Sequence, residues 1–167
     1  IVGANYFYGS ATFIVTTATL IHLYRRHRPD YLRLRRALLI TVALAFGGYV
    51  TFPLMPPRLL DRLGDGTVFG FVDTMAAYPT PWSFASGTVD RVTNQFAAMP
   101  SLHCAFALWC AWVLVPRCRR GLPRLAAALY PLVTLVVVVI TGNHYLLDAV
   151  GAVVVVVAGI VVAGWIT

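Results

Sequence analysis

The sequence contains no lysine and no glutamate, so every basic side chain is an arginine and every acidic side chain is an aspartate. Only 11% of its 167 residues are charged, whereas a soluble domain carries about 25%. Hydrophobic residues make up 59% of the chain and occur in long blocks. This scarcity of charge argues against an ordinary soluble core and is typical of a helical membrane protein.

Cysteine is also scarce. The three cysteines form no C-x-x-C pair and have no spacing suited to zinc. We interpret them as free thiols that pack as small hydrophobic side chains. We expect no cofactor.

The net charge of +7 could indicate a nucleic acid or a membrane surface as partner. Most arginines, however, lie in two short loops between apolar runs, at residues 25–36 and 116–124. That placement is typical of membrane topology signals. We therefore expect contact with membrane lipids and no nucleic acid partner.

Five apolar runs predict membrane-spanning helices, at residues 5–24, 37–53, 101–115, 124–141 and 144–166. A spanning helix needs about 20 residues, so the shorter runs must extend into their neighbours. The many valines do not argue for strands, because a lone strand in lipid leaves its backbone unpaired. The predicted fold is all-α: a polytopic transmembrane helical bundle, residues 1–167, in a single domain. No signal peptide precedes the first run, so we expect an earlier helix and six spans in the full chain.

The arginine-rich loops also predict an orientation. The positive-inside rule puts both loops in the cytoplasm. The protein is then a multi-pass protein of the cell membrane. Residues 56–99 and the turn at residues 141–143 lie on its extracytoplasmic side. Ile1 lies on that side too, and Thr167 lies in the cytoplasm. Residues 56–99 are too long for a plain connection. They include the apolar stretches at residues 68–72 and 75–78, and we expect a short helix near the membrane surface in this segment.

Ionisable side chains cluster at the outer ends of these spans, where they are functional candidates. His144 and Asp148 are four residues apart, which puts them on one face of a helix. The carboxylate can accept the ring N–H, fix the tautomer and stabilise positive charge as the other nitrogen attacks. On this pattern alone, a capped helix start with a buried polar pair is the favoured alternative.

Two further clusters lie on the same side. Ser101 and His103 follow Pro100 at a helix start, where free backbone N–H groups bind anions; a packing role for His103 is equally compatible. Arg58 ends another span and can clamp a phosphate with two hydrogen bonds. Taken alone it is better interpreted as a snorkelling arginine, but an arginine at the outer end of a span is less expected, which modestly favours a function. Arg62 and Arg91 are weaker candidates of the same kind.

Together these residues predict a metal-free phosphoryl-transfer site. Arg58, Ser101 and helix N–H groups would hold the phosphate, His144 would attack phosphorus, and His103 would protonate the leaving oxygen. Two other interpretations stay open. One is a helical channel or scaffold with polar helix caps, and the other is a metal site built from His103, His144 and Asp148.

The motifs resemble those of the type 2 phosphatidic acid phosphatase superfamily, which are K-x6-R-P, P-S-G-H and S-R-x5-H-x3-D. The second reads Pro-Ser-Leu-His at residues 100–103, and the third ends in His-Tyr-Leu-Leu-Asp at residues 144–148. Leu102 replaces the motif glycine, as in a branch similar to inositol phosphorylceramide synthases. Residues 94–99 and 141–143 also resemble that branch in its bacterial form.

The resemblance implies a six-helix fold, a phosphohistidine intermediate and no metal. It assigns His144 as the nucleophile, Asp148 as its partner and His103 as the general acid, with Ser101 and Arg58 as phosphate ligands. Two motif cations are missing, because Thr51 and Val138 stand at their positions.

Arg91 or Asn143 could replace the missing cations, or the substrate could be a less charged phosphodiester. The resulting expectation is a membrane phosphotransferase that moves a head group, such as inositol phosphate, from a lipid-linked phosphate to an alcohol or water acceptor. The alternative is a phosphatase of a lipid phosphate or a polyprenyl diphosphate.

Overall fold

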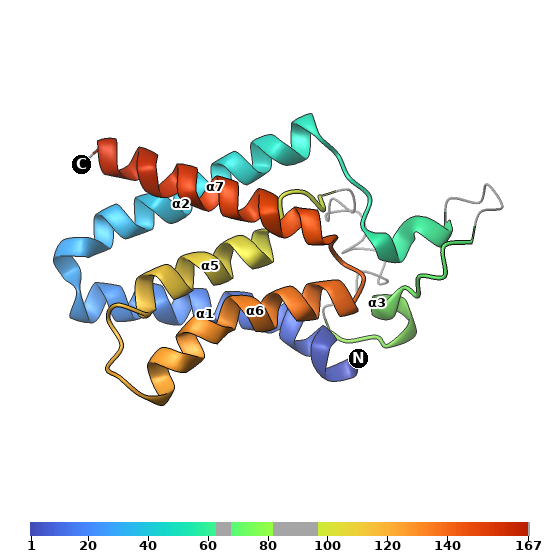
Figure 1. The fold of residues 1–167 in the computed structure, drawn as a ribbon, viewed down its shortest axis with the longest axis horizontal. Helices are drawn as coiled ribbons and strands as arrows, with labels where there is room; N and C mark the ends of the chain where they lie inside the picture. The colour runs from blue at the N-terminus through green and yellow to red at the C-terminus, as the bar shows by residue number, and fades with distance from the viewer. Residues whose placement is uncertain (63–67, 82–96, 167) are drawn as a thin grey trace.

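The computed structural model describes residues 1–62, 68–81 and 97–166. Five long helices form a bundle, and two short elements lie at one end of it (Figure 1). The long helices are α1 (Val2–Arg26), α2 (Arg28–Thr51), α5 (Leu102–Leu114), α6 (Leu122–Ile140) and α7 (Leu146–Trp165). The short elements are the 3-10 helix η1 (Pro57–Arg62) and α3 (Thr74–Ala77). The described residues contain no strand, which confirms the all-α fold class.

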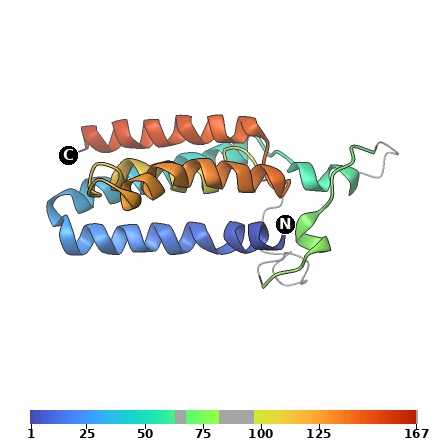
Figure 2. The same cartoon turned by 60° about the horizontal axis from the view of Figure 1, so that its bottom comes forward.

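Helix α5 is the centre of the bundle. It contacts each of the other four long helices, and Figure 2 shows α1 and α7 on opposite sides of the layer that holds α5 and α6. Its thirteen residues are fewer than a bilayer span needs. A short apolar helix of this kind is stable when neighbouring helices surround it, which is the position of α5.

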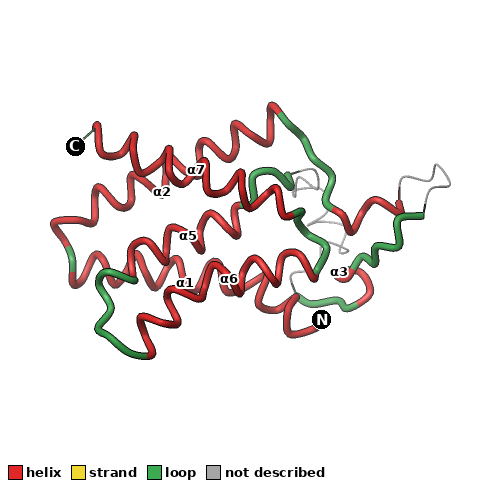
Figure 3. Tube along the Cα trace, in the orientation of Figure 1, coloured by secondary structure: helices red, strands yellow, loops and turns green. Residues whose placement is uncertain are grey.

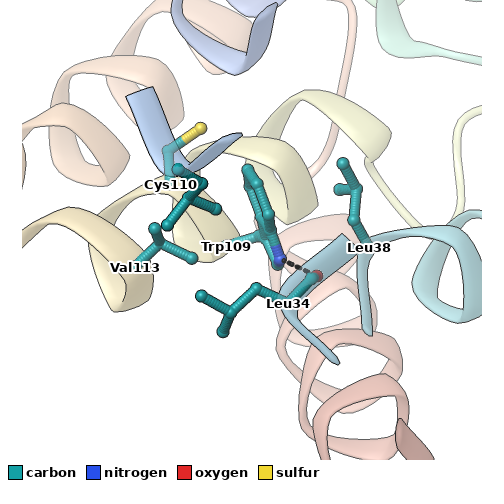
Figure 4. Packing of buried hydrophobic residues seen from close by; sticks show 6 residues of the cluster. Leu34, Leu38, Trp109, Cys110 and Val113 are labelled. Carbon is teal, nitrogen blue, oxygen red and sulfur yellow. Dashed lines mark hydrogen bonds between the residues drawn. The ribbon is translucent and has the colours of Figure 1, made fainter. Parts of the chain in front are cut away.

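One core cluster fixes α5 against α1 and α2 (Figure 4). The Trp109 side chain is fully buried, and its indole N–H donates a hydrogen bond of 3.1 Å to the Leu34 carbonyl oxygen. The buried side chains around it are Leu23, Leu34, Leu38, Cys110 and Val113. The indole is thus satisfied inside an apolar core, as buried tryptophans usually are.

The residues of α1 that face the bundle are mainly small or polar. They recur at alternating steps of four and three, which is one stripe of a helix: Asn5, Gly9, Thr12, Thr16, Thr19 and Leu23. Its opposite face exposes large apolar side chains, among them Phe13, Ile14 and Ile21. Small residues inside and apolar residues outside are what helix packing in lipid requires.

Three helices of the described residues are long and apolar enough to cross a membrane, namely α2, α6 and α7. Their outward faces are apolar as well, as on α7, where Val150, Val154 and Val157 are more than half exposed. Such a surface is unfavourable in water and suits contact with acyl chains. The protein is therefore a helical membrane protein, while spans by α1 and α5 stay predictions.

Both arginine-rich segments lie at the end of the bundle opposite η1 and α3 (Figure 1). The prediction of a loop at residues 25–36 is wrong, because α1 runs to Arg26 and α2 begins at Arg28, with His27 alone between them (Figure 3). Arginine favours helix, and Pro29 is tolerated in a first helical turn.

An ion pair joins the two arginine-rich segments. The Arg117 guanidinium, in the loop that follows α5, binds the Asp30 carboxylate at the start of α2, with 2.6 Å between the nitrogen and oxygen atoms. Arg117 also donates to the Val113 carbonyl oxygen, at 3.0 Å. The α1–α2 turn and the α5–α6 loop are therefore connected at this end of the molecule.

Candidate active site

The turn between α6 and α7 sets the position of the site. After Ile140 the backbone N–H groups of Asn143 and His144 both donate to the Val138 carbonyl oxygen, at 3.1 and 3.2 Å. Gly142 has φ +65°, a conformation that other residues rarely adopt, and a Cβ there would lie 3.2 Å from the Arg58 Cβ. Glycine therefore lets the turn approach η1, whose Arg58 N–H donates to the Gly142 carbonyl oxygen at 2.9 Å.

His144 and Asp148 are in direct contact, although not on one helix as predicted. Helix α7 begins at Leu146, so His144 precedes it and Asp148 lies in its first turn. His144 is excluded from the helix because Tyr145, the N-cap of α7, adopts an extended conformation. Asp148 Oδ2 lies 3.2 Å from His144 Nδ1 and also accepts the Tyr145 N–H, at 2.9 Å.

The surroundings of His144 fix its tautomer. Nδ1 faces two acceptors, the Asp148 carboxylate and the Ala98 carbonyl oxygen, the latter at 2.9 Å. Nδ1 must therefore carry the hydrogen, which leaves the lone pair of the neutral ring on Nε2. Both side chains are buried, with 5% of His144 and none of Asp148 exposed.

His103 faces His144 from the second position of α5. The two ring centroids are 5.9 Å apart and the rings are tilted by 57°, close enough for both rings to contact one phosphate group. The His103 ring also stacks on Tyr8 of α1, at 4.0 Å between centroids and 22° between planes. Helix α1 therefore limits where the His103 ring can point.

Ser101 is fully buried and caps α5. Its hydroxyl oxygen accepts the Cys104 N–H at 3.3 Å, and its own N–H donates to the backbone carbonyl of Asp148 at 3.0 Å. The preceding carbonyl, that of Pro100, accepts a hydrogen bond of 2.8 Å from the Tyr49 hydroxyl of α2. Ser101 thus joins the starts of α5 and α7, and its oxygen already serves as a helix cap.

Arg58 is buried in η1 with 7% of its surface exposed, so it is not a snorkelling arginine. Its Nε–H donates to the Asn143 side-chain oxygen at 2.9 Å. Its Nη1 lies 3.2 and 3.3 Å from the two carboxylate oxygens of Asp73, which precedes α3. Asn143, predicted as a weak phosphate ligand, holds Arg58 through this bond and donates to the Thr141 hydroxyl at 2.8 Å.

The structure thus brings together His103, His144, Asp148 and Arg58, with Ser101 and Asn143 beside them. Arg91 lies outside the described residues, as does the side chain of Arg62. Sequence reasoning missed Asp73, the Ala98 carbonyl and the Tyr8 ring. The available signals were weak: an aspartate in the outer segment in which a short helix was predicted, and a tyrosine in an apolar run.

A phenol lies beside the catalytic candidates. Tyr145 is half-buried, and this burial raises the pKa of its hydroxyl, with the nearby Asp148 carboxylate adding to the effect. The phenol is therefore neutral at physiological pH.

In the described part of the chain, no three His, Cys, Asp or Glu side chains are grouped so that they could hold a metal ion.

The arrangement can do two things chemically. A buried guanidinium can bind an anion, and a histidine whose Nδ1–H is held by a carboxylate can use Nε2 as a nucleophile or base.

A family model described as the PAP2 superfamily, the type 2 phosphatidic acid phosphatase group, matches residues 1–162. No curated protein and no solved structure matches the chain. The chain therefore belongs to the PAP2 superfamily, a group of membrane phosphatases and phosphotransferases that act on lipid phosphates.

Proposed function

We propose that the protein is an integral-membrane phosphotransferase that acts on a lipid-linked phosphate through a phosphohistidine on His144. The observation that carries the proposal is the environment of the His144 ring. Two acceptors at Nδ1 leave the lone pair on Nε2, and the His103 ring lies 5.9 Å away, centroid to centroid. A nucleophile with an orienting carboxylate and a second proton-transfer group forms the set that covalent catalysis needs.

In the first step the Nε2 lone pair of His144 forms a bond to phosphorus, and the bond from phosphorus to the leaving oxygen breaks. His103, protonated at this stage, gives its ring proton to that oxygen, so the leaving group departs as a neutral alcohol. The ring of His144 becomes positively charged, and the Asp148 carboxylate stabilises that charge through Nδ1–H. The Arg58 guanidinium would hold the phosphate by charge-assisted hydrogen bonds to its oxygens.

In the second step an acceptor hydroxyl attacks the phosphorus and gives its proton to His103. The phosphorus–nitrogen bond breaks, and its electron pair returns to Nε2. An alcohol acceptor gives head-group transfer, and we expect inositol phosphate transfer as one form of it. Water as acceptor gives the alternative function, hydrolysis of a lipid phosphate or a polyprenyl diphosphate, through the same intermediate.

We further propose that the site faces the extracytoplasmic side of the cell membrane. The arginine-rich segments lie at the opposite end of the bundle, and such segments stay in the cytoplasm. Labelling of single cysteines in whole cells by a membrane-impermeant reagent tests this orientation. Label at residue 68 and none at residue 119 is the expected pattern, and the reverse pattern contradicts it.

The function is tested by incubating the purified protein with phosphate-labelled lipids, with and without inositol. We expect labelled phosphate to leave at least one lipid, and to appear on inositol when inositol is present. His144→Ala should abolish both events. His22→Ala is the matched control, because His22 is an exposed histidine of α1 far from the site. Full turnover in His144→Ala would support the scaffold interpretation or a different nucleophile.

A further inference from the structure

The general acid of the proposed mechanism is in contact with an aromatic ring of another helix. His103 is the second residue of α5, and its ring stacks on the Tyr8 ring of α1, with 4.0 Å between centroids and 22° between planes. The His103 ring also faces the His144 ring, at 5.9 Å and 57°. The close and nearly parallel contact is therefore with Tyr8, and the wider, tilted one is with the proposed nucleophile.

Tyr8 is itself fixed in place by its surroundings. Asn5, one turn earlier in α1, is fully buried and donates to the carbonyl oxygens of Thr74 and Tyr78, at 2.9 and 3.2 Å. These bonds join this end of α1 to α3. The Tyr8 side chain also packs against a buried cluster from α5, α6 and α7, which consists of Cys104, Ala105, Val138, Ala152 and Val156. Tyr8 can therefore serve as a rigid support for the His103 ring.

General acid catalysis has two requirements that this contact meets. The acid must lie within hydrogen-bond reach of the departing oxygen, and stacking restricts His103 to those rotamers that keep its ring on Tyr8. The acid must also carry a proton. Burial away from water disfavours a charged imidazole, and the negative face of a tyrosine ring offsets part of that cost by a cation–π attraction.

We propose that Tyr8 is a positioning residue for His103, whose ring it holds where the imidazole can protonate the leaving oxygen and whose protonated form it stabilises. His144 is oriented by other means, since the Asp148 carboxylate and the Ala98 carbonyl oxygen both face its Nδ1. Hydrogen bonds thus orient the nucleophile, and stacking orients the acid. The inference rests on the proposed function, and it gives α1 a part in the departure of the leaving group.

Three variants separate the aromatic face of Tyr8 from its bulk and its hydroxyl. Tyr8→Leu removes the face and keeps an apolar side chain, whereas Tyr8→Phe keeps the face and removes the hydroxyl. Tyr6→Leu is the matched control, because Tyr6 lies in the same turn of α1 with 48% of its surface exposed. The probes are phenyl phosphate and 4-nitrophenyl phosphate, each also as its methyl diester, and kcat/KM is measured for every variant.

The phenyl esters depend more on the acid, because phenolate is a more basic leaving group than 4-nitrophenolate. General acid help contributes about 10²- to 10⁴-fold to a rate, so Tyr8→Leu should lower kcat/KM for the phenyl esters at least about tenfold more than for the 4-nitrophenyl esters. Tyr8→Phe and Tyr6→Leu should keep the wild-type ratio of the two. In the His103→Ala background, Tyr8→Leu should not change the ratio further, because its effect is exerted through His103.

A purely structural role of Tyr8 gives a different pattern. Tyr8→Leu would then lower kcat/KM for both leaving groups by one factor, with and without His103, and this result overturns the inference. An unchanged kcat/KM for both leaving groups overturns it as well. Tyr8→Met, which also lacks an aromatic face, replaces Tyr8→Leu if that variant does not fold.

Proton NMR of the detergent-solubilised protein tests the contact without turnover. The ring current of Tyr8 should shift the ring-proton signals of His103 upfield, and His103→Ala identifies these signals. Tyr8→Leu should remove the shift, and Tyr8→Phe should keep it. If the shift is present but the wild type turns over none of the esters, the proposed phosphotransferase is refuted and the role of Tyr8 with it. If turnover is normal and the shift is absent, the inference alone is refuted.

Discussion

Replacing Asp148 with asparagine separates two roles that a carboxylate beside a histidine can have. Oδ2 accepts both the Nδ1–H of His144 and the N–H of Tyr145, and the amide oxygen of an asparagine can accept both in the same way. The Ala98 carbonyl also faces Nδ1, at 2.9 Å. The tautomer of His144 should therefore survive the substitution, and only the negative charge is lost.

The cost follows from the geometry of the pair. When the His144 ring becomes phosphorylated it carries a positive charge, and the nearest carboxylate oxygen lies 3.2 Å from Nδ1. Two unit charges at about this distance interact by about 4 to 5 kcal/mol at an effective dielectric constant of about 20. Loss of about 4 kcal/mol from the transition state lowers the rate by about a thousandfold.

The assay is kcat and KM for a labelled lipid phosphate, with the Kd for substrate measured separately. We expect kcat to fall by about three orders of magnitude, with a Kd within about threefold of the wild type, because Asp148 does not contact the phosphate in the proposed pose. The Asp30→Asn variant controls for loss of an aspartate elsewhere. A kcat within tenfold of the wild type would refute the charge argument, and complete loss of folded protein would show that the carboxylate is chiefly structural.

Three further predictions follow from other contacts. Arg58→Lys removes the guanidinium N–H groups that bind Asn143 and Asp73, so KM should rise at least about tenfold with a smaller change in kcat. Equal KM values for the wild type and the variant would contradict this. Gly159→Ala should lower the unfolding free energy by about 1 to 3 kcal/mol, because its Cβ would lie 2.8 Å from the Ala37 carbonyl oxygen. The control Gly47→Ala should leave the unfolding free energy unchanged, because no atom lies within 4 Å of the added Cβ. Equal melting temperatures of the two variants in detergent would contradict the close packing at Gly159. Activity should persist in EDTA, and loss that is restored by one divalent ion would favour a metal-dependent reaction.

The fold was largely predictable because a bilayer allows few solutions. Lipid satisfies no backbone hydrogen bonds, so apolar runs must be helices, and five of the observed helices correspond to the five predicted runs. The boundaries were harder to predict. Arginine is both a topology signal and a good helix former, so the residues around His27 could be assigned to a loop or a helix with equal reason, and tertiary contacts decided for helix.

The site was predictable only where residues that are close in sequence are close in space. The motif spacing indicated the pair of His144 and Asp148, but not that helix α7 begins after His144. The contacts of Arg58 with Asn143 and of Asp73 with Arg58 join segments 85 and 15 residues apart. No local pattern records them, since they depend on the approach that Gly142 permits between η1 and the α6–α7 turn.

The most direct test of the account is the position of the covalent phosphate. The purified protein is mixed with labelled substrate, quenched within one turnover in alkali, digested and analysed by mass spectrometry. We expect phosphate on a ring nitrogen of His144, stable in alkali, lost in acid, and absent from His144→Ala. Phosphate on His103 or on any other residue, or turnover at the wild-type rate without a phosphorylated histidine, would contradict it.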